Sequence, residues 1–355
     1  MILFYIIIGF IILDLITKDE KMKKRLSILL MIVLTGFSMF RDQSVGTDTR
    51  IFCSAFYLMN DMSIGECLET RYEILNILLF KIIGLISREP QALIVISSVI
   101  INFSIYECII KKSKNPLTTA ILYFTLNYYF SFLCLMRQAL ALAMVLIGFK
   151  MLEKNRYKTY CIFVILACLF HTSAIIFLLL IPFKKISKKV NPMMFVIPIS
   201  IIGFLMGEKI LTISTSIISD YAKYIDSEYV GSSYVTAGLY TLTSLIFLIF
   251  GLFVPARDKI DEKYENDMNY NMLKWIVAIG TIISAISIKI AVFSRVYIYF
   301  GFFSILWLSE SIHLLSKKEN LLIWKTIIYI STMVYVIVLS KYDWYGIFPY
   351  KFFIN

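Results

Sequence analysis

Two polar side chains within long apolar runs are the first candidates for chemistry in this sequence. Arg137 interrupts an apolar run from Ile121 to Phe149, and His171 lies inside the hydrophobic stretch 159–182. An ionisable group in such a setting costs about 3 kcal/mol or more, so one that is kept there is a functional candidate. Histidine can take up a proton near neutral pH, and arginine binds phosphate oxygens two at a time. The alternatives are a structural histidine bonded to a nearby carbonyl and an arginine that reaches to the membrane surface.

A polar run follows the apolar segment 26–40. It extends from Arg41 to Thr49 and contains Gly46, Thr47 and Asp48. Glycine permits positive φ, and Thr and Asp side chains bond local backbone donors, so this composition predicts a turn. Arg41, Thr47 and Asp48 are therefore candidates for a polar site beside a helix end. The alternative is an ordinary capped loop.

Two further positions complete the candidate set. Gln138 directly follows Arg137, and Arg295 begins a segment that also carries Tyr299. Aromatic side chains gather at membrane–water interfaces, so an anchoring role for the aromatic residues of this segment is the alternative.

Several familiar chemistries leave no trace in the sequence. There is no Walker loop, HExxH, GxSxG or paired DxD motif. The six cysteines form no CxxC pair and have no histidine cluster beside them. We therefore expect neither a cofactor nor a metal ion. Cys53 and Cys67 fall in one predicted outer segment, where a disulfide is one interpretation and two small apolar residues is the favoured one.

The composition indicates an integral membrane protein. The 355 residues are 59% hydrophobic and only 17% charged, which is more apolar surface than one soluble core could bury. A transmembrane helix needs about 20 mostly apolar residues, and such segments recur from end to end. We expect an all-α fold in a single transmembrane domain, residues 1–355, with outer loops near 41–72 and 208–236. The net charge of +11 comes from lysines in short loops, so no nucleic-acid partner is expected.

The predicted apolar spans have about 15 to 21 residues, near the length of a membrane helix. They cover roughly 2–16, 26–40, 91–110, 117–135, 138–152, 193–207, 237–254, 271–290, 295–315 and 321–340. Segments 73–87 and 159–182 decide the topology. If 73–87 dips in without crossing and 159–182 is a hairpin broken near His171, all six basic loops face the cytoplasm, as the positive-inside rule requires. This gives about 10–13 membrane helices, including re-entrant or broken segments.

On this topology, arginine and lysine separate across the membrane. Lysines concentrate in the inner loops, and six of the nine arginines fall on the outer side: Arg41, Arg50, Arg71, Arg88, Arg137 and Arg295. A guanidinium group binds phosphate oxygens in a planar fork and stays charged at any working pH. The asymmetry favours a diphosphate site at the outer face. The cluster Arg71-Tyr72-Glu73 at the end of the outer loop is interpreted as an interfacial anchor.

Together these motifs resemble those of a known family. The residues Arg41 to Thr49, Arg137-Gln138-Ala139, Phe170 to Ser173, Arg295 to Tyr299 and Pro349-Tyr350 resemble the EpsG family of polytopic membrane proteins, which are similar to Wzy-type polysaccharide polymerases. The resemblance covers essentially the whole chain. It implies a fold resembling the C-type glycosyltransferases and a site at the outer face of the bacterial cytoplasmic membrane.

The resemblance also implies an activity. Such a polymerase joins undecaprenyl-diphosphate-linked oligosaccharide repeat units for capsule, exopolysaccharide or O-antigen. Our hypothesis assigns the leaving diphosphate to Arg137 and Arg295, with Arg41 assisting, and the acceptor proton to His171, with Asp48 as the competing base. Thr47, Gln138 and Tyr299 are expected to contact the substrate. Membrane lipids and a chain-length regulator are the other partners that it implies.

Other functions remain open at this stage. A flippase or transporter of the same lipid-linked glycan would use the arginines to bind without making a bond. An O-antigen-type ligase would differ in its acceptor. The repeat unit and the linkage are not fixed by the sequence.

Overall fold

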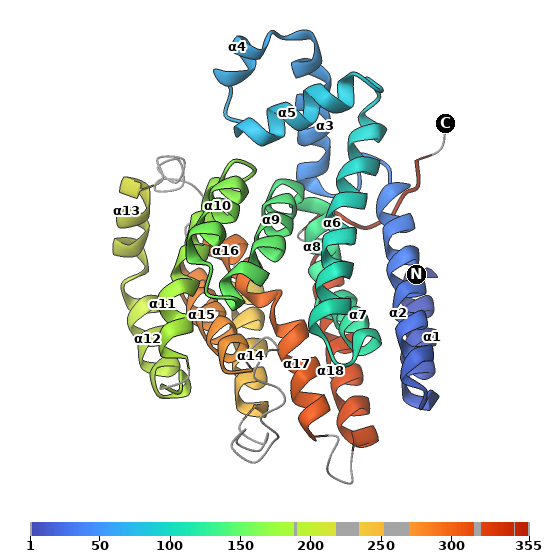
Figure 1. Cartoon of the computed structure of the whole chain (residues 1–355), viewed down its shortest axis with the longest axis vertical. Helices are drawn as coiled ribbons and strands as arrows, with labels where there is room; N and C mark the ends of the chain where they lie inside the picture. Colours follow the sequence, from blue (N-terminus) through green and yellow to red (C-terminus); the bar gives the residue numbers. More distant parts are fainter. Residues whose placement is uncertain are drawn as a thin grey trace. The chain divides into compact units, whose positions relative to one another are not determined.

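The computed structural model describes residues 2–187, 190–217, 234–251, 270–315, 321–343 and 345–353. Every regular element in these residues is a helix, as Figure 1 shows, apart from one isolated β-bridge between Arg41 and Phe352. The predicted all-α class is confirmed.

The helices group into two compact units. The first comprises Met1–Leu178 and Lys325–Asn355, and the second comprises Leu179–Trp324. The first unit contains α1 (Ile2–Ile16), α2 (Glu20–Met39), α3 (Thr47–Asp61), α4 (Ile64–Leu68), α5 (Ile74–Gly84), α6 (Pro90–Lys112), α7 (Pro116–Thr125), α8 (Tyr128–Cys134), α9 (Met136–Glu153), α10 (Tyr157–Cys168), nearly all of the 3-10 helix η1 (Thr172–Leu179) and most of α18 (Leu321–Tyr342). The second contains α11 (Leu180–Ile186), α12 (Met193–Leu205), α13 (Gly207–Ile217), α14 (Tyr234–Phe250), α15 (Tyr270–Lys289), α16 (Phe293–Gly301) and α17 (Ser304–Leu315). The expectation of a single transmembrane domain stays a prediction.

The chain is a multi-pass membrane protein. In the described residues, 4 helices are long and apolar enough to cross a membrane: α6, α15, Val292–Leu315 and α18. Two bent pairs, α7 with α8 at 58° and α12 with the start of α13 at 78°, raise this number to 6. Broken segments are therefore present, as expected, but these two fall at 116–134 and 193–213, where the sequence predicted unbroken spans. The expected total of about 10–13 also counted shorter apolar helices, such as α1, α5, α10 and α14, which fall below the length of a full span.

The predicted hairpin at 159–182 is present and turns at the predicted place. Helix α10 ends at Cys168, and η1 begins at Thr172 after His171. The hydroxyl of Tyr160 donates a hydrogen bond of 2.9 Å to the carbonyl of Phe177, so the chain runs back beside α10. The reversal places His171 at the tip of the hairpin.

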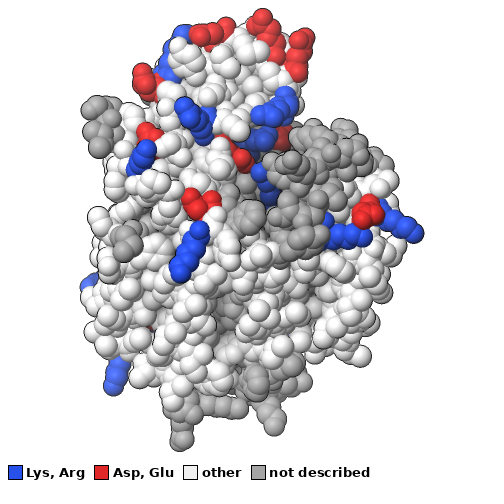
Figure 2. All heavy atoms as spheres, turned by 180° about the vertical axis from the view of Figure 1, so that it is seen from behind, with Lys and Arg blue, Asp and Glu red and all other residues white. Residues whose placement is uncertain are grey.

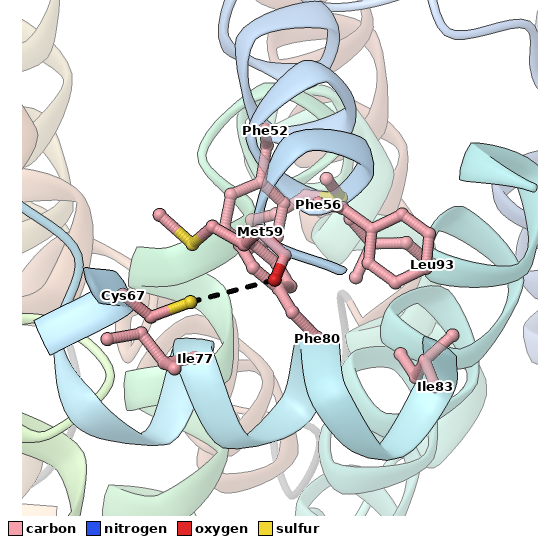
Figure 3. Packing of buried hydrophobic residues seen from close by; sticks show 9 residues of the cluster. Phe52, Phe56, Met59, Cys67, Ile77, Phe80, Ile83 and Leu93 are labelled. Atoms are coloured by element: carbon pink, nitrogen blue, oxygen red, sulfur yellow. Dashed lines mark hydrogen bonds between the residues drawn. The ribbon is translucent and has the colours of Figure 1, made fainter. Parts of the chain in front are cut away.

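The segment 41–72, predicted as an outer loop, is mostly helical. In α3 the buried residues lie at positions i, i+3, i+4, i+7 and i+10, the spacing of one helix face: Thr49, Phe52, Cys53, Phe56 and Met59. Figure 3 shows this face packed against α4 and α5. The cluster consists of Phe52, Phe56, Met59, Cys67, Ile77, Phe80, Ile83, Leu93 and Met136. It holds α3, α4 and α5 together as one compact segment.

Both cysteines of this segment are free. Cys53 and Cys67 are buried, and the Cys67 thiol lies 3.6 Å from the carbonyl oxygen of Met59. They serve as small apolar residues, which agrees with the favoured interpretation.

Helix α5 makes up most of the segment 73–87, which the sequence predicts not to cross the membrane. Its 11 residues span about 16 Å, roughly half of the hydrocarbon thickness. Acidic and basic side chains gather over α3, α4 and α5 in Figure 2. In the same part of the chain, the exposed side chains of Arg88 and Asp61 form an ion pair of 2.9 Å. This charged surface and the short helix agree with a segment that does not span.

The C-terminal segment packs on the run from Arg41 to Thr47. The backbone N–H of Gly46 donates to the carbonyl of Gly346 at 2.9 Å, and that of Thr47 donates to the carbonyl of Tyr345 at 2.8 Å. Gly46 has a φ of 98°, where a Cβ atom would be strained and would lie 2.6 Å from Oγ1 of Thr49. The glycine is therefore required at this turn.

The second unit packs around α15. Helices α12, α14 and α16 all contact it, and Tyr297 of α16 stacks on Tyr240 of α14 with ring centroids 4.8 Å apart. Of the outer loop predicted at 208–236, residues 218–233 lie outside the described residues.

Candidate functional site

The carboxylate of Glu73 contacts both Arg137 and His171. Its Oε2 atom lies 3.0 Å from Nη1 of Arg137, and its Oε1 atom lies 3.2 Å from Nδ1 of His171. Asn76 donates a hydrogen bond of 3.0 Å to Oε2, and the backbone N–H of Thr172 donates one of 3.4 Å to Oε1. These donors fill the acceptor positions of an ionised carboxylate. Glu73 is thus the centre of a polar cluster from three separate segments.

Local structure explains how the three segments meet. Glu73 occupies the N-cap position of α5, where the chain enters the helix. The backbone N–H of Leu75 donates to the carbonyl of Leu169 at 2.9 Å, and the side-chain amide of Asn76 donates to the carbonyl of Phe170 at 2.7 Å. The first turn of α5 is therefore bonded to the tip of the α10–η1 hairpin, beside His171.

Arg137 reaches the cluster from the first turn of α9. The break between α8 and α9 falls at Leu135, and Met136 packs into the apolar cluster of α3–α5. The Arg137 guanidinium carbon lies 5.0 Å from the centroid of the Tyr72 ring, a cation–π contact. Apolar packing on one side and an aromatic ring on the other thus fix the direction of this side chain.

The electrostatics of the cluster favour an ionised Glu73. Its side chain is only 14% exposed, and this burial by itself raises the pKa. The hydrogen bond from His171 and the positive charge of Arg137 outweigh burial and hold the pKa of this carboxyl below its usual range. Glu73 is therefore an anion at neutral pH, outside the membrane-spanning helices.

An ionised Glu73 sets the tautomer of a neutral His171. Because the carboxylate can only accept, Nδ1 of His171 carries the proton in this contact. The other ring nitrogen, Nε2, then has a lone pair, and no described residue occupies it. The His171 side chain is 26% exposed. This is the arrangement in which a carboxylate orients a histidine base.

Arg137 keeps most of its donors available. A guanidinium group has five N–H donors, and among the described residues the one hydrogen bond of Arg137 runs from Nη1 to Glu73. Within the described part of the chain, its other nitrogens have no hydrogen-bond partner, and the side chain is 30% exposed. Arg137 can bind an anionic oxygen while it stays paired with Glu73.

Arg41 lies inside the first unit rather than at an exposed surface. It is 1% exposed, and its Nη1 donates to the Ser38 carbonyl and to Oγ of Ser98. Its Nη2 lies 3.2 Å from the carbonyl oxygen of Leu133 and 3.1 Å from Sδ of Met136. The side chain therefore supports the α8–α9 break that leads into Arg137.

Other sequence candidates of the first unit lie near the α8–α9 break or next to Arg137 in the chain. Thr47 is exposed and its hydroxyl lies 3.2 Å from Sγ of Cys134, while the hydroxyl of Thr49 donates to the carbonyl of Leu133 at 3.0 Å. Asp48 is half-buried in the first turn of α3, and Gln138 is buried in α9 next to Arg137.

Arg295 and Tyr299 belong to the second unit. Arg295 is half-buried in the first turn of α16, and Tyr299 is buried in the same helix. The structure thus brings Arg137 and His171 into one cluster, and leaves Arg295 and Tyr299 in the other unit.

Sequence reasoning missed the two residues that organise the cluster. Glu73 was interpreted as part of an interfacial anchor, and Asn76 was not singled out. Both begin an apolar segment that is too short to span, and a carboxylate three residues before an amide is a weak sign of a polar helix end. In the described ranges, no group of three or more His, Cys, Asp or Glu residues could hold a metal ion.

Comparison with known families gives one clear match. The model of the EpsG family matches residues 24–352, which is most of the chain. A search of curated proteins and a search of solved structures gave no significant match.

Proposed function

The chain belongs to the EpsG family, whose members are membrane proteins implicated in exopolysaccharide biosynthesis, and on that premise we propose that it is a polysaccharide polymerase. Its substrates are oligosaccharide repeat units linked to undecaprenyl diphosphate, at the outer face of the bacterial cytoplasmic membrane. The observation that supports this proposal best is the shared contact of Arg137 and His171 with Glu73.

In the proposed reaction, an acceptor hydroxyl oxygen attacks the anomeric carbon of the donor glycan. The bond from that carbon to the diphosphate oxygen breaks, and undecaprenyl diphosphate leaves with the electron pair. The acceptor proton passes to Nε2 of His171, the ring nitrogen that Glu73 leaves unprotonated.

Arg137 serves the other end of the reaction. Negative charge gathers on the diphosphate oxygens as the bond breaks, and a fixed guanidinium group beside them lowers the barrier. A donor of this kind contributes on the order of 3 kcal/mol, roughly a hundredfold in rate. Its free nitrogens and 30% exposure suit this role.

The remaining candidates have supporting roles. Gln138 and Thr47 border Arg137 and its supporting turn, and Arg41 acts through that turn rather than on the diphosphate. Asp48 stays the competing base. Arg295 and Tyr299, both on α16, stay candidates for binding diphosphate and glycan.

The size distribution of undecaprenyl-linked glycans on the outer leaflet tests the proposal. Cells with the intact chain, without it, with Arg137→Ala and with Arg88→Ala are compared, because Arg88 is an exposed arginine of the same unit. Single repeat units outside in the deletion and Arg137→Ala strains, with polymer in the Arg88→Ala strain, support a polymerase. Repeat units held on the inner leaflet indicate a flippase instead.

A further inference from the structure

An apolar groove lies between α2 and α6 of the first unit. Its volume is about 410 Å³, in the range of roughly 300–1,000 Å³ that is usual for sites of small ligands. Ile28, Ile32 and Gly36 of α2 line one side, and Val99, Phe103 and Tyr106 of α6 line the other. A Cβ atom built on Gly36 would meet nothing within 4 Å, so the floor of the groove is open there.

Two of the polar side chains at the groove, Thr35 and Asn102, already have partners. Thr35 donates to the carbonyl of Met31 at 2.7 Å, and Asn102 donates to the carbonyl of Ser98 at 2.9 Å. The hydroxyl of Tyr123 lies 3.4 Å from Oδ1 of Asn102. Since α6 is long and apolar enough to cross a membrane, a hydrocarbon chain suits this groove better than a polar ligand.

One end of the groove is basic. Gln91 at the start of α6 donates to the carbonyl of Met39 at the end of α2, and Oγ of Ser98 lies 2.8 Å from Oγ of Ser38. Because α2 and α6 also pack on each other, they are antiparallel, and their lysine-rich ends lie together. Lys21, Lys24 and Arg25 are exposed on α2, and each precedes Ile28 by three, four or seven positions. At these spacings, side chains share one face of a helix. The three cations therefore lie on the same face of α2 as the groove.

These three cations differ from the basic residues around them. Lys23 is paired with Glu20, Lys111 with Glu107 and Lys112 with Glu153. In the described residues, the side chains of Lys21, Lys24 and Arg25 have no acidic partner within ion-pair distance. An anion at this end of the groove would meet three unpaired positive charges beside an apolar channel.

We propose that the α2–α6 groove binds one anionic glycerophospholipid. Its acyl chain lies along Ile32, Gly36 and Phe103, and its phosphate lies against Lys21, Lys24 and Arg25. The basic end of the site lies at the opposite end of α2 from Arg41, and the proposal is independent of the proposed polymerase activity. Each basic side chain near a membrane surface contributes roughly 1 kcal/mol to the attraction of an anionic lipid, so three of them discriminate clearly against a neutral one.

Photo-crosslinking tests this site directly. The full chain is placed in phosphatidylcholine nanodiscs with a trace of phosphatidylglycerol that carries a diazirine in its acyl chain, and the labelled peptides are identified by mass spectrometry. We expect labelling in α2 and α6 at the groove. The triple variant K21Q/K24Q/R25Q should reduce it roughly tenfold or more. Gly36→Leu, which fills the groove and keeps the charges, should reduce it as well.

Matched controls separate the groove from general surface charge. The variant K154Q/R156Q/K158Q removes three exposed basic side chains elsewhere in the same unit and should leave labelling unchanged. Equal labelling by a phosphatidylcholine probe, no effect of Gly36→Leu, or an equal loss in the control variant would each overturn the proposal. So would crosslinks to a second copy of the chain in place of lipid.

Discussion

Nδ1 of His171 lies 3.2 Å from Oε1 of Glu73, at the point where the α10–η1 hairpin reverses beside the first turn of α5. The contact fixes the direction of the imidazole ring and places its proton on Nδ1. Nε2 keeps its lone pair, as the proposed base role requires. Neither residue alone would achieve this, because a histidine on a hairpin tip can otherwise rotate between orientations and tautomers.

Glu73→Gln should remove this control while it preserves side-chain size. A glutamine amide offers His171 no negative charge and can present a donor where the ring needs an acceptor. We expect turnover to fall by at least about 100-fold with little change in substrate binding. Polymer formation and lipid-linked substrate binding, measured on the same purified variant, check this. The exposed Glu69→Gln is the control, and a loss in that variant as well would contradict the account.

His171→Gln distinguishes a base from a hydrogen-bond donor. Glutamine can donate to a phosphate oxygen but cannot take a proton near neutral pH. A base role predicts loss of turnover by about 100-fold or more with normal binding of the lipid-linked substrate. Substantial activity in this variant would show that His171 only donates to phosphate.

The lowered pKa of Glu73 predicts a pH dependence of stability. A carboxyl group whose pKa is depressed by folding stabilises the folded state above its ordinary pKa of about 4.3, and this contribution is lost as the pH falls through the lowered value. The Tm difference between the intact chain and Glu73→Gln should thus be present above about pH 5 and shrink below about pH 4. A difference that grows as the pH falls below about 4 would contradict the ion-pair cluster.

The sequence predicts those parts of the site that stand out within their own segment, and misses those that depend on contacts between distant segments. Arg137 and His171 stand out because each is a charged or titratable group in a long apolar run, and the hairpin break at His171 follows from the placement of the lysines. Glu73 does not stand out, since it lies at the edge of a polar loop. Its role appears only when α5 packs against the hairpin tip, a contact between residues almost a hundred positions apart in the chain.

Arg41 illustrates the same limit. As the first polar residue after an apolar segment, it has the sequence context of an exposed membrane-surface arginine. The C-terminal segment and the α8–α9 break cover it, and its donors meet the carbonyls of Ser38 and Leu133. Burial of this kind is a tertiary property, so composition and periodicity near position 41 could not predict it.

Arg41→Lys should weaken the turn that carries Arg137. The two terminal nitrogens of Arg41 donate to Oγ of Ser98 and to the carbonyl of Leu133, and the single ammonium group of a lysine cannot reproduce both bonds in this geometry. Acceptors left unsatisfied in a buried site cost about 1–3 kcal/mol each. We expect a lower Tm for the purified variant together with reduced turnover, and a variant with unchanged Tm would contradict the supporting role.

A buried ion pair offers a test of the helix packing in the first unit. Oδ2 of Asp14 in α1 lies 2.8 Å from Nζ of Lys325 in α18, and both residues are buried. The hydroxyl of Thr118 in α7 lies 3.1 Å from the same oxygen. Lys325→Met leaves a buried carboxylate unpaired and should destabilise the chain by about 3–5 kcal/mol. The double variant with Asp14→Asn should recover much of this loss, and equal, additive losses would contradict the pairing.

The most direct test of the central claim uses lipid-linked repeat units isolated from cells that lack this chain. The purified chain in nanodiscs is incubated with this material, and mass spectrometry counts the repeat units in each product for the intact chain, Arg137→Ala and Arg88→Ala. We predict products of several repeats with the intact chain and with Arg88→Ala, and single repeats with Arg137→Ala. Single repeats with the intact chain, or polymer with Arg137→Ala at the normal rate, would contradict the account.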